Sequence, residues 1–171
     1  MKSYTKSWIV KGILIIAFFA IDLLSKYFLQ KHFENGGESI VVIKNFFNLE
    51  YVKNSGVAFG MFQNSIVASL LFPIIFLVAF VVYDVLCKGK KMPYIIGFSL
   101  IIAGALGNLY DRIILKFVRD FFAMSIFPFV FNFADACVTI GFIMIMIVLI
   151  FDIAKGDKKK QENKFNKETK E

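Results

Sequence analysis

Four apolar segments, each about twenty residues long, constrain the fold of this chain more than any other feature. They cover residues 8–29, 66–86, 92–114 and 136–153. A helix needs about twenty mainly apolar residues to cross the hydrocarbon core of a bilayer. The composition agrees, because 58% of the residues are hydrophobic and 22 are Phe, whereas an ordinary soluble domain is about half apolar. We therefore predict an all-α membrane protein with four transmembrane helices.

These four segments account for most of the chain, so we predict one integral membrane domain over residues 1–154. Residues 155–171 are lysine-rich and lack apolar periodicity, which predicts a disordered cytoplasmic tail. The first apolar segment has a basic start, as a secretory signal peptide does. Its apolar stretch from Ile13 to Ile21 is followed by Asp22 and Lys26 in place of a small-residue cleavage pattern, so we expect this segment to remain as a true span.

The distribution of basic residues predicts the orientation of the protein in the membrane. If both termini are cytoplasmic, thirteen of the 20 lysines and arginines lie on the inner side, where the net charge is the full +7 of the chain. The outer side is then neutral. Cytoplasmic loops of membrane proteins carry such an excess of Lys and Arg, which also attracts anionic lipid headgroups. The basic charge thus calls for no nucleic-acid partner.

Two segments are expected outside the membrane on the opposite face. Residues 38–62 are rich in β-branched and aromatic side chains between Gly and Asn turn signals, which predicts a small extracytoplasmic β-sheet cradle. Residues 115–134 combine seven Phe with few charges, which predicts an amphipathic outer loop in the membrane interface. Its Phe side chains are candidates for a lid over a site.

Strongly polar residues gather at the outer ends of the predicted helices. At about 1.5 Å per residue, Asp22 lies roughly 20 Å and Asn108 roughly 24 Å from the inner ends of their helices. Lys26 follows Asp22 by one turn, and Asp111 and Arg112 mark the outer boundary of the third span. Ionisable residues inside a membrane protein are candidates for function. A simple Asp22–Lys26 anchor and a snorkelling Asp111–Arg112 pair are the structural alternatives.

The outer segments add further polar residues to this layer, and two of them are aspartates. Asn54 and Asp120 come from the outer segments, and Asn132 and Asp135 lie where the fourth span begins. Near lipid, desolvation and a second carboxylate both favour a shared proton. One ionised member can then take a proton from water while the other polarises a carbonyl, which is amide hydrolysis without a covalent intermediate. The separation of Asp120 and Asp135 permits their contact but does not require it.

Other chemistries have weaker support in the sequence. Cys87 and Cys137 are predicted near opposite membrane faces, and His32 is the one histidine. We therefore expect no metal site and no cofactor, and we interpret Cys137 as a packing residue. The alternative function is a small proton- or ion-coupled transporter or channel subunit. It predicts polar residues near the bilayer midplane and repeated halves, whereas the polar layer here is at one face.

Five sequence blocks in the order of the chain resemble the lipoprotein signal peptidases, the type II signal peptidases of bacteria. The blocks are DLLSK at 22–26, NSGVAFG at 54–60, GALGNLYDR at 104–112, VRDF at 118–121 and FNFAD at 131–135. The resemblance implies four helices with a small outer sheet, in the bacterial cytoplasmic membrane. It also implies an aspartic endopeptidase with its active site at the extracytoplasmic face. Such an enzyme removes signal peptides from diacylglyceryl-modified prolipoproteins, cutting just before the lipidated cysteine.

The resemblance also assigns roles to residues of this chain. It implies Asp120 and Asp135 as the catalytic pair and three supporting residues, Asp22, Lys26 and Asp111. Residues implied to bind substrate are Asn54, Gly56, Asn108, Arg112, Asn132 and Ala134. The implied partners are diacylated prolipoprotein signal peptides and membrane lipids, and a complete site within one chain favours a monomer.

Two positions depart from the family pattern. Arg119 stands where the family more often has an apolar residue, so we expect its charge to lower the pKa of Asp120. Pro128 lies one residue earlier than the proline usual before the block at 131–135, which affects the local path of the loop.

Overall fold

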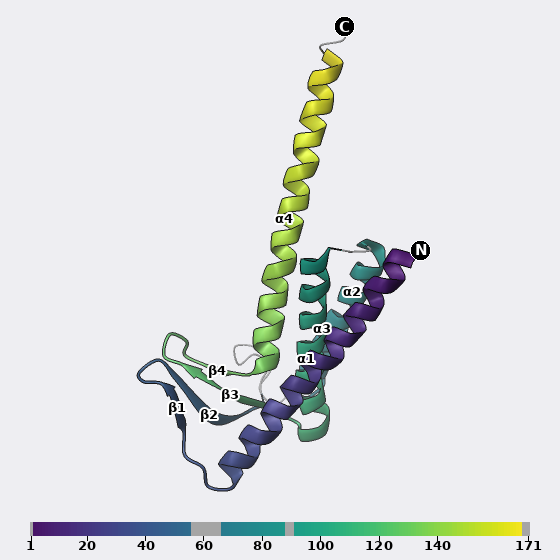
Figure 1. Ribbon diagram of the computed structural model, residues 1–171. Coiled ribbons are helices and arrows are strands. Elements are labelled where there is room, and N and C mark those ends of the chain that lie inside the picture. The colour runs from purple at the N-terminus through teal and green to yellow at the C-terminus, as the bar shows by residue number, and fades with distance from the viewer. Residues whose placement is uncertain (1, 56–65, 88–90, 169–171) are drawn as a thin grey trace.

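The computed structural model describes residues 2–55, 66–87 and 91–168. The described chain forms helices and one small sheet (Figure 1). The helices are α1 (Lys2–Glu34), α2 (Ile66–Cys87), α3 (Met92–Leu115) and α4 (Phe133–Glu168). The strands are β1 (Ile40–Ile43), β2 (Phe47–Asn54), β3 (Val118–Met124) and β4 (Val130–Phe131).

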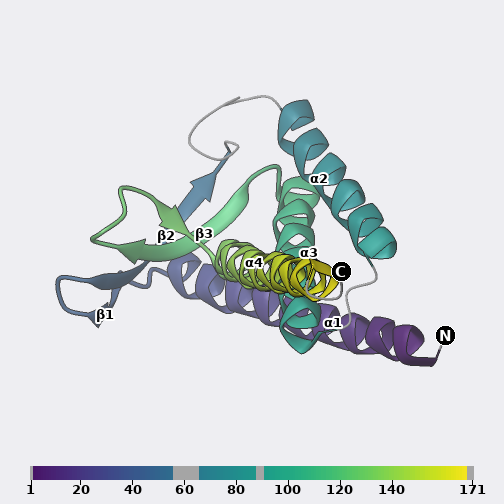
Figure 2. The ribbon, with the colours of Figure 1, turned by 90° about the horizontal axis from the view of Figure 1, so that it is seen from above.

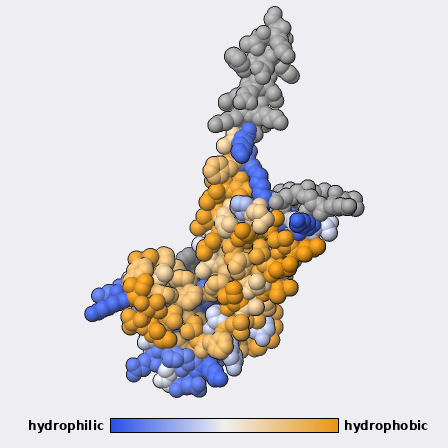
Figure 3. Space-filling view, in the orientation of Figure 1, coloured by the Kyte–Doolittle hydropathy of each residue, from blue (hydrophilic) through white to orange (hydrophobic). Residues whose placement is uncertain are grey.

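Three helices within the described residues are long and apolar enough to cross a membrane, over Thr5–Glu34, Met92–Leu115 and Phe133–Lys155. The apolar part of α2 is shorter, at Pro73–Leu86. Apolar side chains form a continuous surface over the helices in the space-filling view (Figure 3). A soluble protein rarely exposes so large an apolar surface. The structure is therefore a mostly helical membrane protein, with α2 as the helix whose span is the least marked.

The central helix of the bundle is α3, which is buried along most of its length and packs against α1, α2 and α4 (Figure 2). Glycines allow α3 and α4 to approach closely. A Cβ atom on Gly141 would lie 2.5 Å from the Gly97 carbonyl oxygen, and one on Gly104 would lie 2.4 Å from the Ala134 carbonyl oxygen. Small residues in such a seam let membrane helices pack backbone to backbone. This packing places the start of α4 beside the C-terminal half of α3.

The sheet is antiparallel with the strand order β1-β2-β3-β4. Residues 115–134 were predicted to form one amphipathic loop, and that prediction is wrong, because β3 and β4 form a hairpin there. Val118, Phe121 and Phe122 have the β-branched and aromatic side chains that suit a strand, and β2 supplies the partner edge. In the β2–β3 register Val52 pairs with Asp120 and Asn54 pairs with Val118. Pairing with β2 thus brings Asp120 and Asn54 to the same end of the sheet.

The prediction of a disordered tail at residues 155–171 also differs from the structure, in which α4 continues to Glu168. The helix rises well beyond the other helices (Figure 1). Lys, Gln and Glu are good helix formers. Extending a helix that already exists also avoids the unfavourable nucleation step, so a polar segment without an apolar face can remain helical here.

The glycine seam generates a stability prediction. Gly141→Ala places a methyl group against the backbone of α3, so we expect it to lower the free energy of unfolding by about 1–3 kcal/mol through overpacking. Thermal unfolding of the purified protein in detergent measures the change. Gly12→Ala is the matched control, because no atom lies within 4 Å of a Cβ at that helical position. An equal melting temperature for Gly141→Ala and the native protein would contradict the close α3–α4 contact.

Candidate active site

Asp120 and Asp135 lie in one pocket, and Asn132 joins them. Asp120 is in β3, and Asp135 is in the first turn of α4. The Asn132 side-chain amide donates to Asp120 Oδ1 at 2.6 Å, and the Asn132 backbone N–H donates to Asp135 Oδ2 at 3.1 Å. Both aspartates line a cavity of about 240 Å³. The structure therefore brings together the two carboxylates that the sequence singled out.

The local sequence explains why Asn132 and Asp135 meet. Asn132 immediately precedes α4, and its Oδ1 accepts a hydrogen bond from the Asp135 backbone N–H at 3.0 Å. Asp135 accepts in return from the Asn132 backbone N–H. This reciprocal pair is a capping box, which satisfies backbone donors at a helix start. Because its Oδ1 is engaged with the cap, the Asn132 amide nitrogen is directed towards Asp120.

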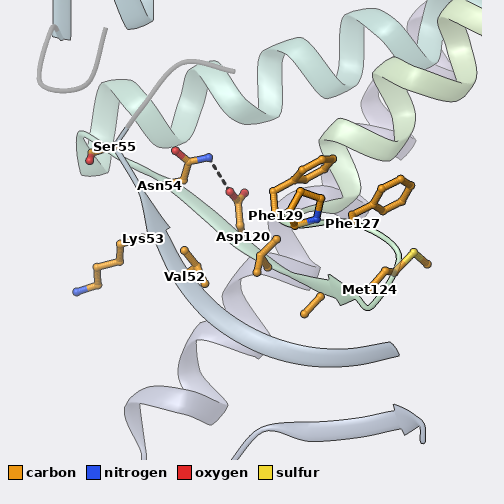
Figure 4. A pocket seen from close by; sticks show the side chains of 11 residues that line it. Val52, Lys53, Asn54, Ser55, Asp120, Met124, Phe127 and Phe129 are labelled. Carbon is orange, nitrogen blue, oxygen red and sulfur yellow. Dashed lines mark hydrogen bonds between the residues drawn. The ribbon is translucent and has the colours of Figure 1, made fainter. Parts of the chain in front are cut away.

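Two further asparagines donate hydrogen bonds to the second oxygen of each carboxylate. Asn54 Nδ2 donates to Asp120 Oδ2 at 2.8 Å (Figure 4). Asn108 Nδ2 donates to Asp135 Oδ1 at 2.7 Å. The Asn108 Oδ1 accepts from Lys26 Nζ at 3.0 Å and from Asn132 Nδ2 at 3.1 Å. A lysine only donates, so Lys26 fixes which end of the Asn108 amide turns towards Asp135.

Burial raises the pKa of Asp120 to about 6, and the nearby charge of Asp135 raises it too. Hydrogen bonds from Asn54 and Asn132 and the charge of Lys26 act in the opposite direction, because they favour the ionised form. The expectation that Arg119 lowers this pKa is wrong. Arg119 donates instead to Asp111, with Nη2 at 2.6 Å from Oδ1. The two side chains of Arg119 and Asp120 point to opposite faces of the strand, as successive residues do.

Asp22 and Lys26 form more than an isolated anchor. Lys26 Nζ lies 2.8 Å from Asp22 Oδ2 and 3.6 Å from Asp111 Oδ2, and all three side chains are buried. The other oxygen of Asp22 accepts the Ala134 backbone N–H at 3.0 Å. A Cβ on Gly107 would lie 2.2 Å from Asp22 Oδ2, so this position needs glycine. The pair thus ties α1 to α3 and to the start of α4.

The remaining sequence-predicted residues have mixed placements. Arg112 lines the pocket that holds the two aspartates, and its Nη1 donates weakly to the Asn108 carbonyl oxygen at 3.5 Å. Ala134 is fully buried, and its backbone N–H is engaged by Asp22; its side chain is not among those that line the pocket. Asp111 is buried in a charge network and is not a snorkelling anchor. Gly56, with residues 57–60 of its block, lies outside the described residues.

Two larger hollows adjoin the aspartate pocket and share residues with it. On the sheet side, a hollow of about 650 Å³ includes Asn54 and Asp120 and is bordered by Phe127 and Phe129 (Figure 4). On the helix side, a groove of about 350 Å³ includes Asn108, Arg112 and Asp135. Other residues along this groove come from α2, α3 and α4: Pro73, Phe76, Ala105, Val138 and Thr139. The aspartates therefore stand between two open spaces.

Sequence reasoning missed a second buried ion pair, far from this site along the helices. Lys11 of α1 lies 2.5 Å from Asp84 of α2, and both side chains are fully buried. The Lys11 amine also lies 4.9 Å from the centre of the Trp8 ring and 4.7 Å from that of Phe98. The available signal was a lone lysine within an apolar segment, which must find a partner. Sequence reasoning also missed Gln30, whose side-chain oxygen accepts a hydrogen bond from Arg119 Nη1 at 2.9 Å. Nothing in its sequence context marks it.

The fold and the paired carboxylates together are those of a membrane enzyme of the aspartic peptidase type. A family model described as "Signal peptidase (SPase) II" matches residues 14–151. A lipoprotein signal peptidase of Clostridium acetobutylicum is 42% identical over 127 residues, which cover 71% of this chain and 80% of that protein. One of Clostridium novyi is 38% identical over 144 residues, which cover 81% of this chain and 96% of that protein.

Solved structures agree with these relatives. One, described as a bacterial membrane enzyme, superposes with a TM-score of 0.72 at 29% identity, covering 88% of this chain and 91% of that one. A second, with the same description, has a TM-score of 0.68 at 30% identity and covers 85% of this chain and 92% of that one. The chain belongs to the signal peptidase II family. It is a bacterial multi-pass membrane peptidase, and the family gives no support to the alternative of a transporter subunit.

The asparagine contacts generate a prediction of pH dependence. Asn54 donates to the ionised Asp120 carboxylate and so keeps its pKa below the value that burial alone would produce. In Asn54→Ala, that pKa rises above about 6. We expect the inflection of peptidase kcat/KM that reports Asp120 to move to higher pH.

Asn48→Ala is the matched control for this measurement, because Asn48 lies on the same strand, opposite Ala123 and away from the aspartates. Its profile should coincide with that of the native enzyme. An inflection that stays in place, or moves to lower pH, in Asn54→Ala would show that the contact with Asp120 does not govern the titration.

Proposed function

We propose that Asp120 and Asp135 are the catalytic pair with which this signal peptidase removes signal peptides from prolipoproteins. We further propose that it cuts the diacylglyceryl-modified precursor just before the lipidated cysteine. The family match supports the removal of prolipoprotein signal peptides. The observation that carries the residue assignment is the link through Asn132, which holds two carboxylates from β3 and α4 in a single pocket.

In the proposed mechanism the two carboxyl groups share one proton. In the reactive form Asp120 carries it, because burial and the charge of Asp135 raise its pKa to about 6, which keeps a protonated fraction of Asp120 available near neutral pH. Asp135 is ionised and takes a proton from a water molecule, whose oxygen attacks the scissile carbonyl carbon. Asp120 donates its proton to the carbonyl oxygen. When the tetrahedral gem-diol collapses, one of its hydroxyls returns a proton to Asp120 as the carbonyl re-forms. The C–N bond breaks and Asp135 gives its proton to the leaving amine, so the pair is restored and no covalent enzyme intermediate forms.

The two hollows beside the pocket suggest how the substrate lies. We propose that the groove between α2, α3 and α4 takes the apolar signal segment, because most of its lining residues are apolar and it shares Asp135 with the pocket. The sheet-side hollow, which shares Asp120, takes the chain on the other side of the cut. The scissile bond then lies between the aspartates. Phe127 and Phe129 stand at the edge of this hollow, where they can cover the bound chain.

We propose that α2 crosses the membrane together with α1, α3 and α4, which makes four spans, and that both termini are cytoplasmic. The bias of basic residues supports this orientation. The aspartates belong to β3 and the first turn of α4, which lie at the end of the bundle away from the start of α1 and the end of α4 (Figure 1). This arrangement supports an extracytoplasmic site. A prolipoprotein anchored by acyl chains in the outer leaflet presents its cleavage site at that level. We propose that membrane lipids surround the bundle. A site built from one chain supports a monomer. The peptidase domain then covers residues 1–154.

Substitution of the aspartates tests the catalytic assignment. Asp120→Asn and Asp135→Asn keep the side-chain size but remove the titrating group. We expect each to lower kcat for a diacylated prolipoprotein at least a thousand-fold, with folding and substrate binding retained, because neither a shared proton nor an activated water remains. Turnover is measured with purified enzyme in lipid.

Asp152→Asn serves as the control, because Asp152 is an exposed acid on α4 that pairs with Lys91. It should retain native turnover. Native-like activity in either Asp120→Asn or Asp135→Asn would eliminate the proposed pair. Equal cleavage of lipidated and unlipidated precursors would leave the pair intact and refute the proposed requirement for a modified cysteine.

The groove assignment makes a separate prediction. Thr139→Trp fills the groove with a bulky side chain, so we expect KM for the prolipoprotein to rise by roughly tenfold, the effect of losing a few apolar contacts. Ile140→Trp is matched in size and helix, but Ile140 is not among the residues along the groove. The same KM in both variants would place the signal segment elsewhere.

A further inference from the structure

Arg119 makes an unusually complete set of contacts for a residue that departs from the family pattern. Its Nε and Nη2 donate to the two oxygens of Asp111 at 3.1 and 2.6 Å. Its backbone N–H also donates to Asp111 Oδ2 at 3.1 Å. The remaining Nη1 donates to Gln30 Oε1 at 2.9 Å. A buried two-point contact of this kind is both strong and directional, so Arg119 ties β3 to α3 and to the outer end of α1.

The position of this tie matters because Arg119 precedes Asp120 in the same strand. Successive residues of a strand point to opposite faces. Arg119 therefore faces the helices, while Asp120 faces the pocket and meets Asn54 and Asn132. Asp111 holds both the backbone and the side chain of Arg119, which fixes the point on β3 from which the Asp120 side chain extends.

Arg119 also balances charge in the network below the pocket. Asp22 and Asp111 are both buried, and their cations are Lys26 and Arg119. If the guanidinium is removed, Lys26 becomes the cation nearest to Asp111. In the native protein its amine lies 3.6 Å from Asp111 Oδ2. A closer approach of Lys26 to Asp111 draws its amine from the Asn108 Oδ1, which it now contacts at 3.0 Å. Asn108 in turn holds Asp135, so the loss reaches the second aspartate as well.

We propose that Arg119 is a positioning residue of the peptidase, and that its pair with Asp111 sets the place of Asp120 opposite Asp135. This inference rests on the proposed function, in which Asp120 is catalytic. Arg119 itself points away from the pocket and is not a substrate contact. Its effect reaches the reaction through the β3 backbone and through the Lys26–Asn108 contact.

Three variants test the role of this pair. In Arg119→Met, we expect kcat to fall at least tenfold while KM changes less than about threefold, because the pocket remains but its carboxylates are displaced. The inflection that reports Asp120 should move to higher pH, since the donors Asn54 and Asn132 lose their alignment. Arg119→Lys keeps the charge without the planar fork and should recover part of kcat.

The double variant Asp111→Asn/Arg119→Met separates positioning from charge balance. It removes the unpaired buried charge of the single variant, so we expect the melting temperature to recover. The tether from β3 to α3 is still absent, so kcat should remain low. Lys116→Met is the control for the loss of one positive charge, because Lys116 is exposed and its amine donates to the nearby Ile113 carbonyl oxygen. It should behave as the native enzyme.

Native kcat in folded Arg119→Met would overturn the inference. Recovery of both kcat and melting temperature in the double variant would overturn it as well, because Arg119 would then serve only to neutralise Asp111. If Arg119→Met fails to fold, the double variant and Arg119→Lys provide the same comparison. An active Asp120→Asn variant refutes the proposed function itself, whereas an inactive Asp120→Asn with a fully active Arg119→Met refutes only the role of Arg119.

Discussion

The rest of the site depends on the ion pairs and the hydrogen bond that the buried amine of Lys26 makes. A lysine inside a membrane bundle is tolerated only when its charge is paired and its donors are used. Lys26 contacts Asp22, Asn108 and Asp111, which belong to α1 and α3. Through Asp22 the same contact reaches the Ala134 backbone N–H at the start of α4. One charge thus fixes three helices at the end of the bundle that carries the sheet, and it orients the Asn108 amide.

Asparagine side chains connect the Lys26 network to the two carboxylates. Asn108, Asn132 and Asn54 each donate to an aspartate oxygen. An amide is neutral, so it can hold a carboxylate in place without supplying a full positive charge. That choice allows burial to dominate at Asp120, whose pKa is raised to about 6 despite two hydrogen bonds. Direct pairing with Arg119 would have favoured the ionised acid, and the structure directs that guanidinium to Asp111 instead.

The sheet and the bundle contribute different halves of the site. The bundle supplies Asp135 through the helix cap of α4, and close packing at Gly104 sets where that helix begins. The sheet supplies Asp120 through the pairing of β2 with β3. The hydrogen bond from Asn132, at the start of α4, to Asp120 on the sheet joins the two halves. A small displacement of β3 against α3 therefore changes the separation of the carboxylates, which is why the anchorage of β3 matters for the chemistry.

The sequence by itself determined the membrane class and the layer of polar residues at one end of the helices, and it singled out Asp120 and Asp135 as a candidate pair, because apolar length and the cost of charge near lipid are local properties. It did not determine the β3–β4 hairpin, since a Phe-rich segment becomes a strand only when β2 offers its edge. It also left open the partners of Arg119 and Lys11. Those contacts join residues far apart in the chain, so tertiary packing alone decided which buried cation met which carboxylate.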